Sequence, residues 1–204
     1  MSLHLARVAK NKNIPILVDA EKPRPYLDEL LQSADIVVTS ENFFQSENGS
    51  SSSEASGSGR NMLSSILHLA EKTLVNAKLI IVTRGSIGSI AFANPKGGLV
   101  KDITNHEIGP EVERQIHDND CIEKEKLVDD LGGPSYQGVK KPIVREVGET
   151  VLISSSALIP DVIDTTGAGD AYIGALIYGF LRGQDASIAN IITFASIVAG
   201  LKCR

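Results

Sequence analysis

Cysteine is scarce in this chain of 204 residues, which contains only Cys121 and Cys203. The two lie far apart in the sequence, and neither belongs to a Cys-x-x-Cys pair. The sequence therefore argues against a disulfide framework and against a structural zinc site. Because the N-terminus also lacks the apolar core of a signal peptide, we expect a reducing compartment, the cytoplasm.

Long apolar stretches and an excess of positive charge are lacking as well. Gly, Lys or Arg interrupts each apolar stretch before it reaches the roughly 18 residues of a membrane span. The formal net charge is -5, from 20 Lys and Arg against 25 Asp and Glu. No broad cationic face is therefore expected for a nucleic acid backbone. We expect a soluble protein that binds neither membranes nor nucleic acids.

The length and composition bound the domain organisation. With 42% hydrophobic and 22% charged residues, the chain can bury one sizeable core but is too short for two ordinary domains. Residues 1–13 show a short amphipathic helical pattern and lead directly into a buried strand, which is typical of a start within a fold. We therefore interpret residues 1–204 as one partial domain.

Short apolar runs alternate with helical periods along the chain. Such runs predict strands, and apolar residues at helical spacing predict helices. The alternation of strands and helices predicts a parallel sheet that helices cover, and the short connection after residue 83 suggests a local hairpin. The expected strands are 14–19, 36–39, 79–83, 89–92, 142–147 and 150–154, and the expected helices are 26–33, 62–74, 171–181 and one that Ser187 caps.

Two long loops are expected between these elements. Seven of the fourteen residues at 46–59 are serine, and without an apolar period this stretch is expected to be flexible. A second loop at 101–135 is acidic and is expected to be a solvated insertion. It contains His106, His117 and Cys121, whose surroundings have no recognised metal-ligand rhythm, so we expect loop residues rather than a metal site.

The most informative segment runs from Asp164 to Asp170, with the sequence DTTGAGD. It delivers Gly167, Ala168 and Gly169 onto a helix N-terminus, where unpaired N–H groups and the helix dipole favour an anion. A dinucleotide fingerprint needs Gly or Ala where this chain has Tyr172, and a Walker-type loop needs a Gly-Lys-Ser or Gly-Lys-Thr that the chain lacks. Two readings remain, phosphoryl transfer with Asp170 as the base and a plain structural turn.

The segment from Asp164 to Tyr172 resembles the second signature of the ribokinase-like, or pfkB, family of carbohydrate and nucleoside kinases. Val18-Asp19, Asn42 and the segment from Val82 to Gly88 support the resemblance in the same order along the chain. The resemblance implies a three-layer α/β/α sandwich with a mainly parallel sheet, of which the N-terminal part has no counterpart here. It also implies ATP-dependent phosphoryl transfer to a hydroxyl of a sugar, nucleoside or related small molecule, with Mg²⁺ and a monovalent cation such as K⁺.

The resemblance also assigns roles to individual residues. It implies that Asp170 is the catalytic base and that the glycine-rich turn is the anion hole. Gln45 stands where the family's Asn-x-x-Glu motif has its carboxylate, and a neutral amide cannot supply that charge to magnesium. The implied residues are Gly167, Ala168 and Gly169 for the anion hole, Thr83 and Gly85 for nucleotide contacts, Asn42 for magnesium and phosphate, and Asp164 and Thr166 for the monovalent cation.

A second hypothesis comes from a different class of protein. Gln45, the lack of a counterpart to the family's N-terminal part and the two unusual loops are also compatible with a catalytically silent homologue. Such a homologue would bind a nucleotide or a protein partner without transferring phosphate. The two hypotheses differ in whether nucleotide binding is followed by turnover.

Overall fold

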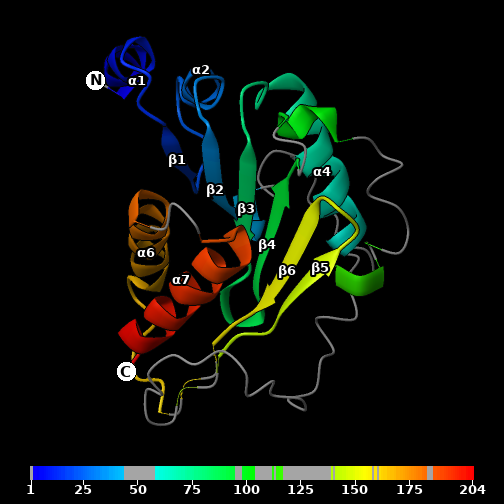
Figure 1. Cartoon of the computed structure of the whole chain (residues 1–204), viewed down its shortest axis with the longest axis vertical. Coiled ribbons are helices and arrows are strands. Elements are labelled where there is room, and N and C mark those ends of the chain that lie inside the picture. Colours follow the sequence, from blue (N-terminus) through cyan, green and yellow to red (C-terminus); the bar gives the residue numbers. More distant parts are fainter. Residues whose placement is uncertain are drawn as a thin grey trace.

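A six-stranded sheet of order β1-β2-β3-β4-β6-β5 forms the centre of the computed structural model (Figure 1). The structure describes residues 2–43, 58–94, 98–103, 112, 114–116, 139, 141–157, 159, 161–182 and 186–204. The strands are β1 (Leu17–Ala20), β2 (Ile36–Ser40), β3 (Leu79–Thr83), β4 (Gly88–Ala93), β5 (Val144–Val147) and β6 (Val151–Ser155).

The sheet is mixed, and the expectation of a mainly parallel sheet is wrong. β1, β2 and β3 are parallel, whereas β4 is antiparallel to both β3 and β6, and β5 is antiparallel to β6. The cause is the length of the connections, because a parallel crossover needs about a dozen residues or more. Only the short 3-10 helix η1 (Gly85–Ile87) separates β3 from β4, and three turn residues separate β5 from β6.

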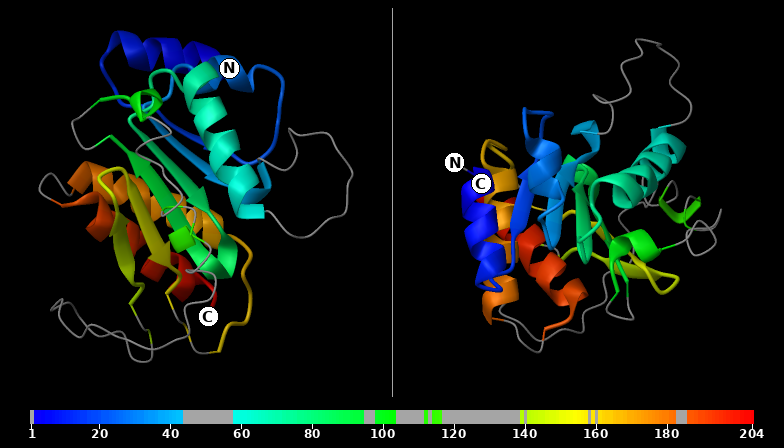
Figure 2. Two further views of the ribbon diagram at one scale, coloured as in Figure 1. Left: turned by 90° about the vertical axis from the view of Figure 1, so that its right-hand side faces the viewer. Right: turned by 90° about the horizontal axis from the view of Figure 1, so that it is seen from above.

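Helices cover both faces of the sheet, as the two further views show (Figure 2). On one face α2 (Leu27–Leu31) and α4 (Ser58–Lys72) pack on the strands, and α1 (Ser2–Asn11) lies beside α2. On the other face lie α6 (Ala168–Arg182) and α7 (Ile188–Lys202). Each face has its own buried cluster, and the three-layer α/β/α arrangement is therefore confirmed.

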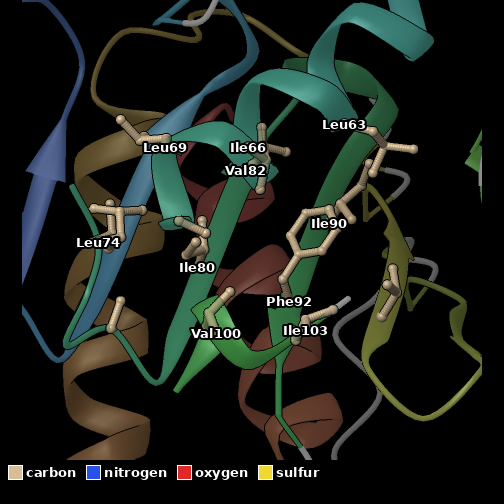
Figure 3. Close-up of a cluster of buried hydrophobic side chains, with 14 of the residues drawn as sticks. Leu63, Ile66, Leu69, Leu74, Ile80, Val82, Ile90, Phe92, Val100 and Ile103 are labelled. Carbon is tan, nitrogen blue, oxygen red and sulfur yellow. The ribbon is translucent and has the colours of Figure 1, made fainter. Parts of the chain in front are cut away.

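The larger cluster lies under α4 (Figure 3). Alternate residues of a strand point to the same face, so β3 sends every second side chain toward this helix. The members that the figure labels are Leu63, Ile66 and Leu69 of α4, Leu74 after it, Ile80 and Val82 of β3, Ile90 and Phe92 of β4, and Val100 and Ile103.

The other residues of β3 face the second pair of helices. Leu79 and Ile81 pack with Tyr172 and Leu176 of α6 and with Ile192 of α7. The two faces of β3 therefore carry two different cores, which is why this strand reads as an unbroken apolar run. α6 is held with its N-terminus at the end of the sheet where β3 finishes.

The two expected loops are described only in part. Residues 46–57 lie outside the described residues, and Ser58 and Gly59 begin α4 rather than ending a loop. In the range 101–135, Ile103, Val112 and Ile116 are buried in the larger cluster. The expectation of a solvated insertion is therefore wrong at these positions, because apolar residues among the acids reach the core.

His106, His117 and Cys121 lie outside the described residues. Within the part of the chain that the structure describes, no group of three or more His, Cys, Asp or Glu residues is arranged to hold a metal ion. No helix among the described residues has both the length and the apolar character to cross a membrane.

Candidate functional site

The glycine-rich turn leads directly into α6. Gly167 has a φ of 77° and precedes the first residue of the helix, Ala168. The N–H of Ala168 donates to the carbonyl of Thr165 at 3.1 Å, and the N–H of Ala171 donates to the carbonyl of Gly167 at 2.9 Å. The turn thus opens a helix of 15 residues, whose dipole favours negative charge at this end.

A second turn, between β3 and β4, faces the same end of the sheet. Thr83 ends β3, and its hydroxyl donates to the carbonyl of Thr39 at 3.2 Å. The N–H of Arg84 donates to the carbonyl of Gly88 at 2.8 Å, which closes the turn. Gly85 has a φ of 56°, the left-handed conformation that glycine adopts without strain.

The two turns share one cavity of about 710 Å³. Four of the predicted site residues line it, Thr83 and Gly85 from the strand end and Ala168 and Gly169 from the helix. The other lining residues are Ser86, Gly88, Ser156, Ala157, Ile159, Val162, Thr165, Tyr172, Ser196, Ala199, Gly200 and Cys203. The cavity therefore joins two motifs that lie far apart in the sequence, the segment from Val82 to Gly88 and the segment from Asp164 to Tyr172.

Asp170 lies in the first turn of α6 with its side chain exposed. It is close enough to Asp19, at the end of β1, to act on that carboxyl. Burial raises the pKa of Asp19, and so do the charges of Glu21 and Asp170, while Arg24 opposes them. The resemblance gave Asp19 no role of its own, and the structure brings it near enough to Asp170 for the two charges to interact.

Asp164 and Thr166 precede the glycine-rich turn and are both exposed. The N–H of Thr166 donates to Asp164 Oδ1 at 2.9 Å. This bond, with a side-chain hydrogen bond from Thr166 and the charge of Lys202, lowers the pKa of Asp164. The N–H groups of Ile163 and Asp164 donate to the carbonyl of Cys203 at 2.8 and 3.3 Å, so the end of α7 is tied to this segment.

Asn42 lies apart from the cavity lining. It belongs to a helical turn at residues 41–43 that follows β2, and its side chain is exposed while Phe43 is buried. Gln45, the residue that replaces a carboxylate of the family motif, lies outside the described residues. Asn42 thus lies at the end of the sheet where β2 finishes, but it is not among the residues that line the cavity.

Three residues that line the cavity had no site role assigned from the sequence, Tyr172, Ser196 and Cys203. The hydroxyl of Tyr172 donates to Ser89 Oγ at 2.9 Å in a buried bond, and burial raises the pKa of Tyr172 to about 12. Ser196 of α7 and Cys203, the residue that caps the C-terminus of α7, also line the cavity. Their spacing of seven residues, about two helical turns, is the sequence signal that would have found them together.

Residues 136–204 match the family model described as pfkB family carbohydrate kinase. The predicted resemblance to the pfkB family is confirmed. No curated protein matches the sequence significantly. The matched range includes the glycine-rich turn, α6 and α7, and residues from all three line the cavity.

Solved structures show the same fold along nearly the whole chain. The Arabidopsis thaliana ribokinase, solved with ribose and ATP, is 18% identical with a TM-score of 0.57, and the match covers 99% of this chain and 45% of that one. The adenosine kinase of Sinorhizobium meliloti is 15% identical with a TM-score of 0.56, covering 99% and 43%. The aminoimidazole riboside kinase of Salmonella enterica, solved with aminoimidazole riboside and an ATP analogue, is 16% identical with a TM-score of 0.53, covering 95% and 47%. The chain thus spans less than half the length of these three kinases.

Proposed function

We propose that this chain forms the nucleotide-binding and phosphoryl-transfer part of a pfkB-type kinase. Such a kinase transfers a phosphoryl group from ATP to a hydroxyl of a sugar, nucleoside or related small molecule. The observation that carries the proposal is the single cavity shared by Thr83, Gly85, Ala168 and Gly169. The scarcity of cysteine supports a cytoplasmic location.

The cavity suits a nucleotide in size and in chemistry. Its volume of about 710 Å³ lies within the range of roughly 300 to 1,000 Å³ that small-molecule sites occupy. One end is the N-terminus of α6, which favours the phosphates, and the remaining wall is made of small apolar and hydroxyl residues. The ribokinase of the same fold was solved with ATP and ribose.

Asp170 is the proposed catalytic base. Its carboxylate takes the proton of the acceptor hydroxyl while that oxygen forms a bond to the γ-phosphorus and the bond to the β-phosphate oxygen breaks. The N-terminus of α6, at Gly167, Ala168 and Gly169, stabilises the negative charge on the transferring phosphoryl group through the helix dipole. Because the N–H of Ala168 already donates to the carbonyl of Thr165, the proposed donors to the phosphoryl group are the N–H groups of Gly167 and Gly169. The base and the anion hole are adjacent because the turn and the first helical turn are contiguous.

The residues at the end of the sheet that carries the site also fit the cations that the family implies. Burial and then the charges of Glu21 and Asp170 raise the pKa of Asp19, and a divalent cation bound to the Asp19 carboxylate would relieve the repulsion from the other two. Asp19 and Asn42 supply oxygen ligands of the kind that Mg²⁺ prefers, and Mg²⁺ supplies charge neutralisation on the phosphates. Asp164 and Thr166 are the residues that would hold a monovalent cation, and the hydrogen bond from the Thr166 N–H to Asp164 Oδ1 keeps the two together.

The test of the proposed base is the substitution Asp170→Asn. It should leave ATP affinity nearly unchanged, because the amide keeps the shape of the carboxylate and repels phosphate less. It should lower the transfer rate by about 10²-fold or more through loss of the base. The measurement pairs calorimetric titration with phosphorylation of a panel of sugars and nucleosides, on this chain and on the longest in-frame product of its gene. Equal turnover by the variant and the wild type would remove Asp170 from the mechanism.

The replacement of a motif carboxylate by Gln45 favours a second candidate function. On this alternative the protein is a catalytically silent homologue that binds nucleotide or a protein partner. The same pair of assays separates the two functions. Tight ATP binding without phosphorylation of any acceptor, in both lengths of the protein, would favour the silent homologue.

A further inference from the structure

A charged pair joins two neighbouring strand ends at the edge of the sheet that carries the site. Ser40 of β2 lies opposite Thr83 of β3 in the parallel register, so the next residues, Glu41 and Arg84, leave the sheet side by side. Arg84 Nε lies 3.5 Å from Glu41 Oε2. Only 4% of the Arg84 side chain and 22% of the Glu41 side chain is exposed.

Burial of these side chains is unusual for their type. Arg and Glu are rarely buried unless they are paired, because removing a charge from water is costly. The same two charges on the surface would contribute little to stability. The structure thus keeps a buried guanidinium and its carboxylate partner at the one edge where the glycine turns and Asp170 lie.

Each member of the pair belongs to one of the turns that carry predicted site residues. Glu41 precedes Asn42 in the helical turn after β2. Arg84 precedes Gly85, and its backbone N–H and C=O both bond within the turn, to Gly88 and Ile87. A shift of either side chain therefore moves the backbone of a turn at the site, although neither residue lines the cavity.

We infer that Glu41 and Arg84 are positioning residues that hold the Asn42 turn and the Gly85 turn at a fixed separation for nucleotide binding. This inference rests on the proposed function, because it names what aligns the same site. The pair acts through the backbone and does not touch the nucleotide. Its loss should therefore weaken nucleotide affinity more than the loss of an ordinary ion pair.

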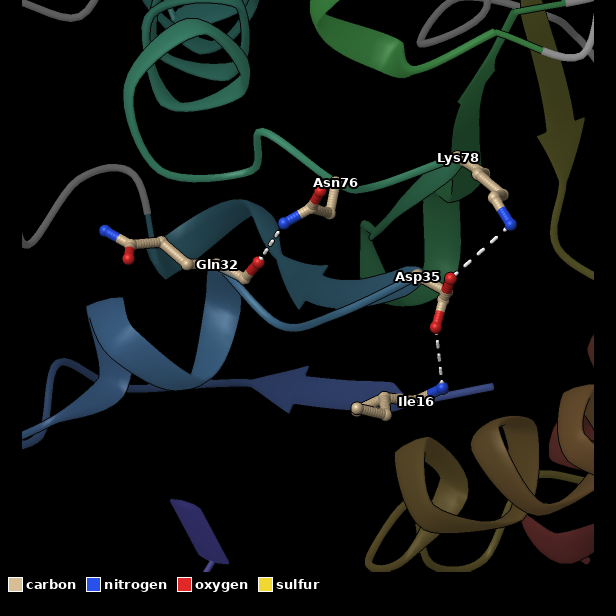
Figure 4. A network of polar contacts seen from close by, with 5 residues as sticks. All are labelled: Ile16, Gln32, Asp35, Asn76 and Lys78. Atoms are coloured by element: carbon tan, nitrogen blue, oxygen red, sulfur yellow. Dashed lines mark hydrogen bonds and ion pairs between the residues drawn. The ribbon is translucent and has the colours of Figure 1, made fainter. Parts of the chain in front are cut away.

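The opposite end of the same strands provides a matched control (Figure 4). Lys78 Nζ lies 3.5 Å from Asp35 Oδ1, at the residues that precede β3 and β2. The distance equals that of the Arg84–Glu41 pair, but 64% of the Lys78 side chain and 32% of the Asp35 side chain is exposed. Removing Lys78 thus removes an ion pair between the same two strands, away from the site.

The experiment is a titration of the 204-residue chain with ATP and Mg²⁺, followed by calorimetry, for Arg84→Met, Glu41→Gln, the double variant and Lys78→Met. Thermal unfolding of each protein is measured in parallel. Arg84→Met and Glu41→Gln should each weaken ATP affinity by about 10-fold. The double variant should lose no more affinity than the single variant with the larger loss, because the two residues act as a unit. Lys78→Met should stay within about 2-fold of the wild type.

Arg84→Lys and Glu41→Gln keep the inference testable if Arg84→Met does not fold. Lysine keeps the charge but lacks the planar fork of arginine, so Arg84→Lys should recover part of the affinity. Folded variants with a lower melting temperature but wild-type ATP affinity would overturn the inference, because they would show a purely structural pair. Additive losses in the double variant would overturn it too. A wild-type chain that binds no nucleotide would instead overturn the proposed function.

Discussion

Gly167 has a backbone conformation that other residues adopt only with strain. Its φ is 77°, whereas the space around it is open, with Lys202 Cε 3.7 Å from the position of an added Cβ. Gly167→Ala should therefore lower the free energy of unfolding by about 1–2 kcal/mol through the backbone alone. Gly169→Ala is the matched control, because nothing lies within 4 Å of its added Cβ and its φ is not in the left-handed region. Urea denaturation measures both, and an equal loss in the two variants would contradict the assignment of strain to Gly167.

Tyr172 and Ser89 form a buried hydroxyl pair in the cavity wall. Tyr172→Phe leaves the Ser89 hydroxyl buried without its donor and should cost about 1–2 kcal/mol of unfolding free energy. Tyr178→Phe, at an exposed tyrosine of the same helix, should cost almost nothing. Urea denaturation of the two variants near neutral pH measures the difference, and equal stability would contradict a contribution from the buried bond.

The same tyrosine predicts a pH dependence. Its pKa is raised to about 12 in the folded protein, against about 10 for an unperturbed tyrosine. The stability from keeping Tyr172 neutral is thus fully present below pH 10 and is lost as pH rises from about 10 to 12, where the unfolded chain releases a proton that the folded chain retains. Unfolding free energies measured from pH 9 to 11.5 should fall less steeply in Tyr172→Phe than in the wild type. Parallel curves would contradict the burial argument.

At the scale of elements, the β3–β4 hairpin depends on Gly88. Its φ is 122°, and an added Cβ would lie 2.0 Å from the carbonyl oxygen of Ser154 in the neighbouring strand. Gly88→Ala should thus lower the free energy of unfolding by about 3 kcal/mol or more, because both the turn and the β4–β6 pairing must shift. In α6, Gly174→Ala meets nothing within 4 Å and should stabilise the protein by about 0.5–1 kcal/mol. Denaturant unfolding measures both variants. Equal changes in unfolding free energy for Gly88→Ala and Gly174→Ala would contradict the requirement for glycine at the hairpin.

The sequence predicted most of the elements but not how all of them pair. The apolar run at 79–83 matches β3 residue for residue, and Ser187 caps α7 by accepting the N–H of Asn190 at 3.2 Å. These features are local, so local patterns reveal them. The position of β6 beside β4 is a contact between segments some sixty residues apart, and no local pattern carries that information. The sequence therefore predicted a mainly parallel sheet, whereas the sheet in the structure is mixed.

At the scale of the whole molecule, the acidic range 101–135 contributes to the core. Ile116 is 1% exposed and belongs to the larger cluster. Ile116→Ala should therefore cost about 2–4 kcal/mol of unfolding free energy, as for other large-to-small core changes. Leu5→Ala, at an exposed position of α1, is the control and should cost less than about 1 kcal/mol. A negligible loss of unfolding free energy for Ile116→Ala, measured by denaturant unfolding, would instead support a solvated insertion at 101–135.

The candidate site could be predicted where it follows from the topology of parallel strands. Thr83 ends a strand and Ala168 begins a helix, as the sequence patterns indicate, and the structure brings both to one cavity. The predicted site residues that do not line that cavity are Asn42, Asp164, Thr166, Gly167 and Asp170. The Arg84–Glu41 pair was not predicted, because a charged residue after a strand has the sequence signature of an exposed loop residue.

The cavity between the β3–β4 turn and the N-terminus of α6 is the proposed nucleotide site. The most direct measurement is a structure of the chain determined with a non-hydrolysable ATP analogue and Mg²⁺. The triphosphate should contact the backbone of Gly167, Ala168 and Gly169, and the nucleoside should lie between the Gly85 turn and the face of α7 that carries Ser196. An analogue bound elsewhere on the molecule, or no bound analogue at saturating concentration, would contradict the claim.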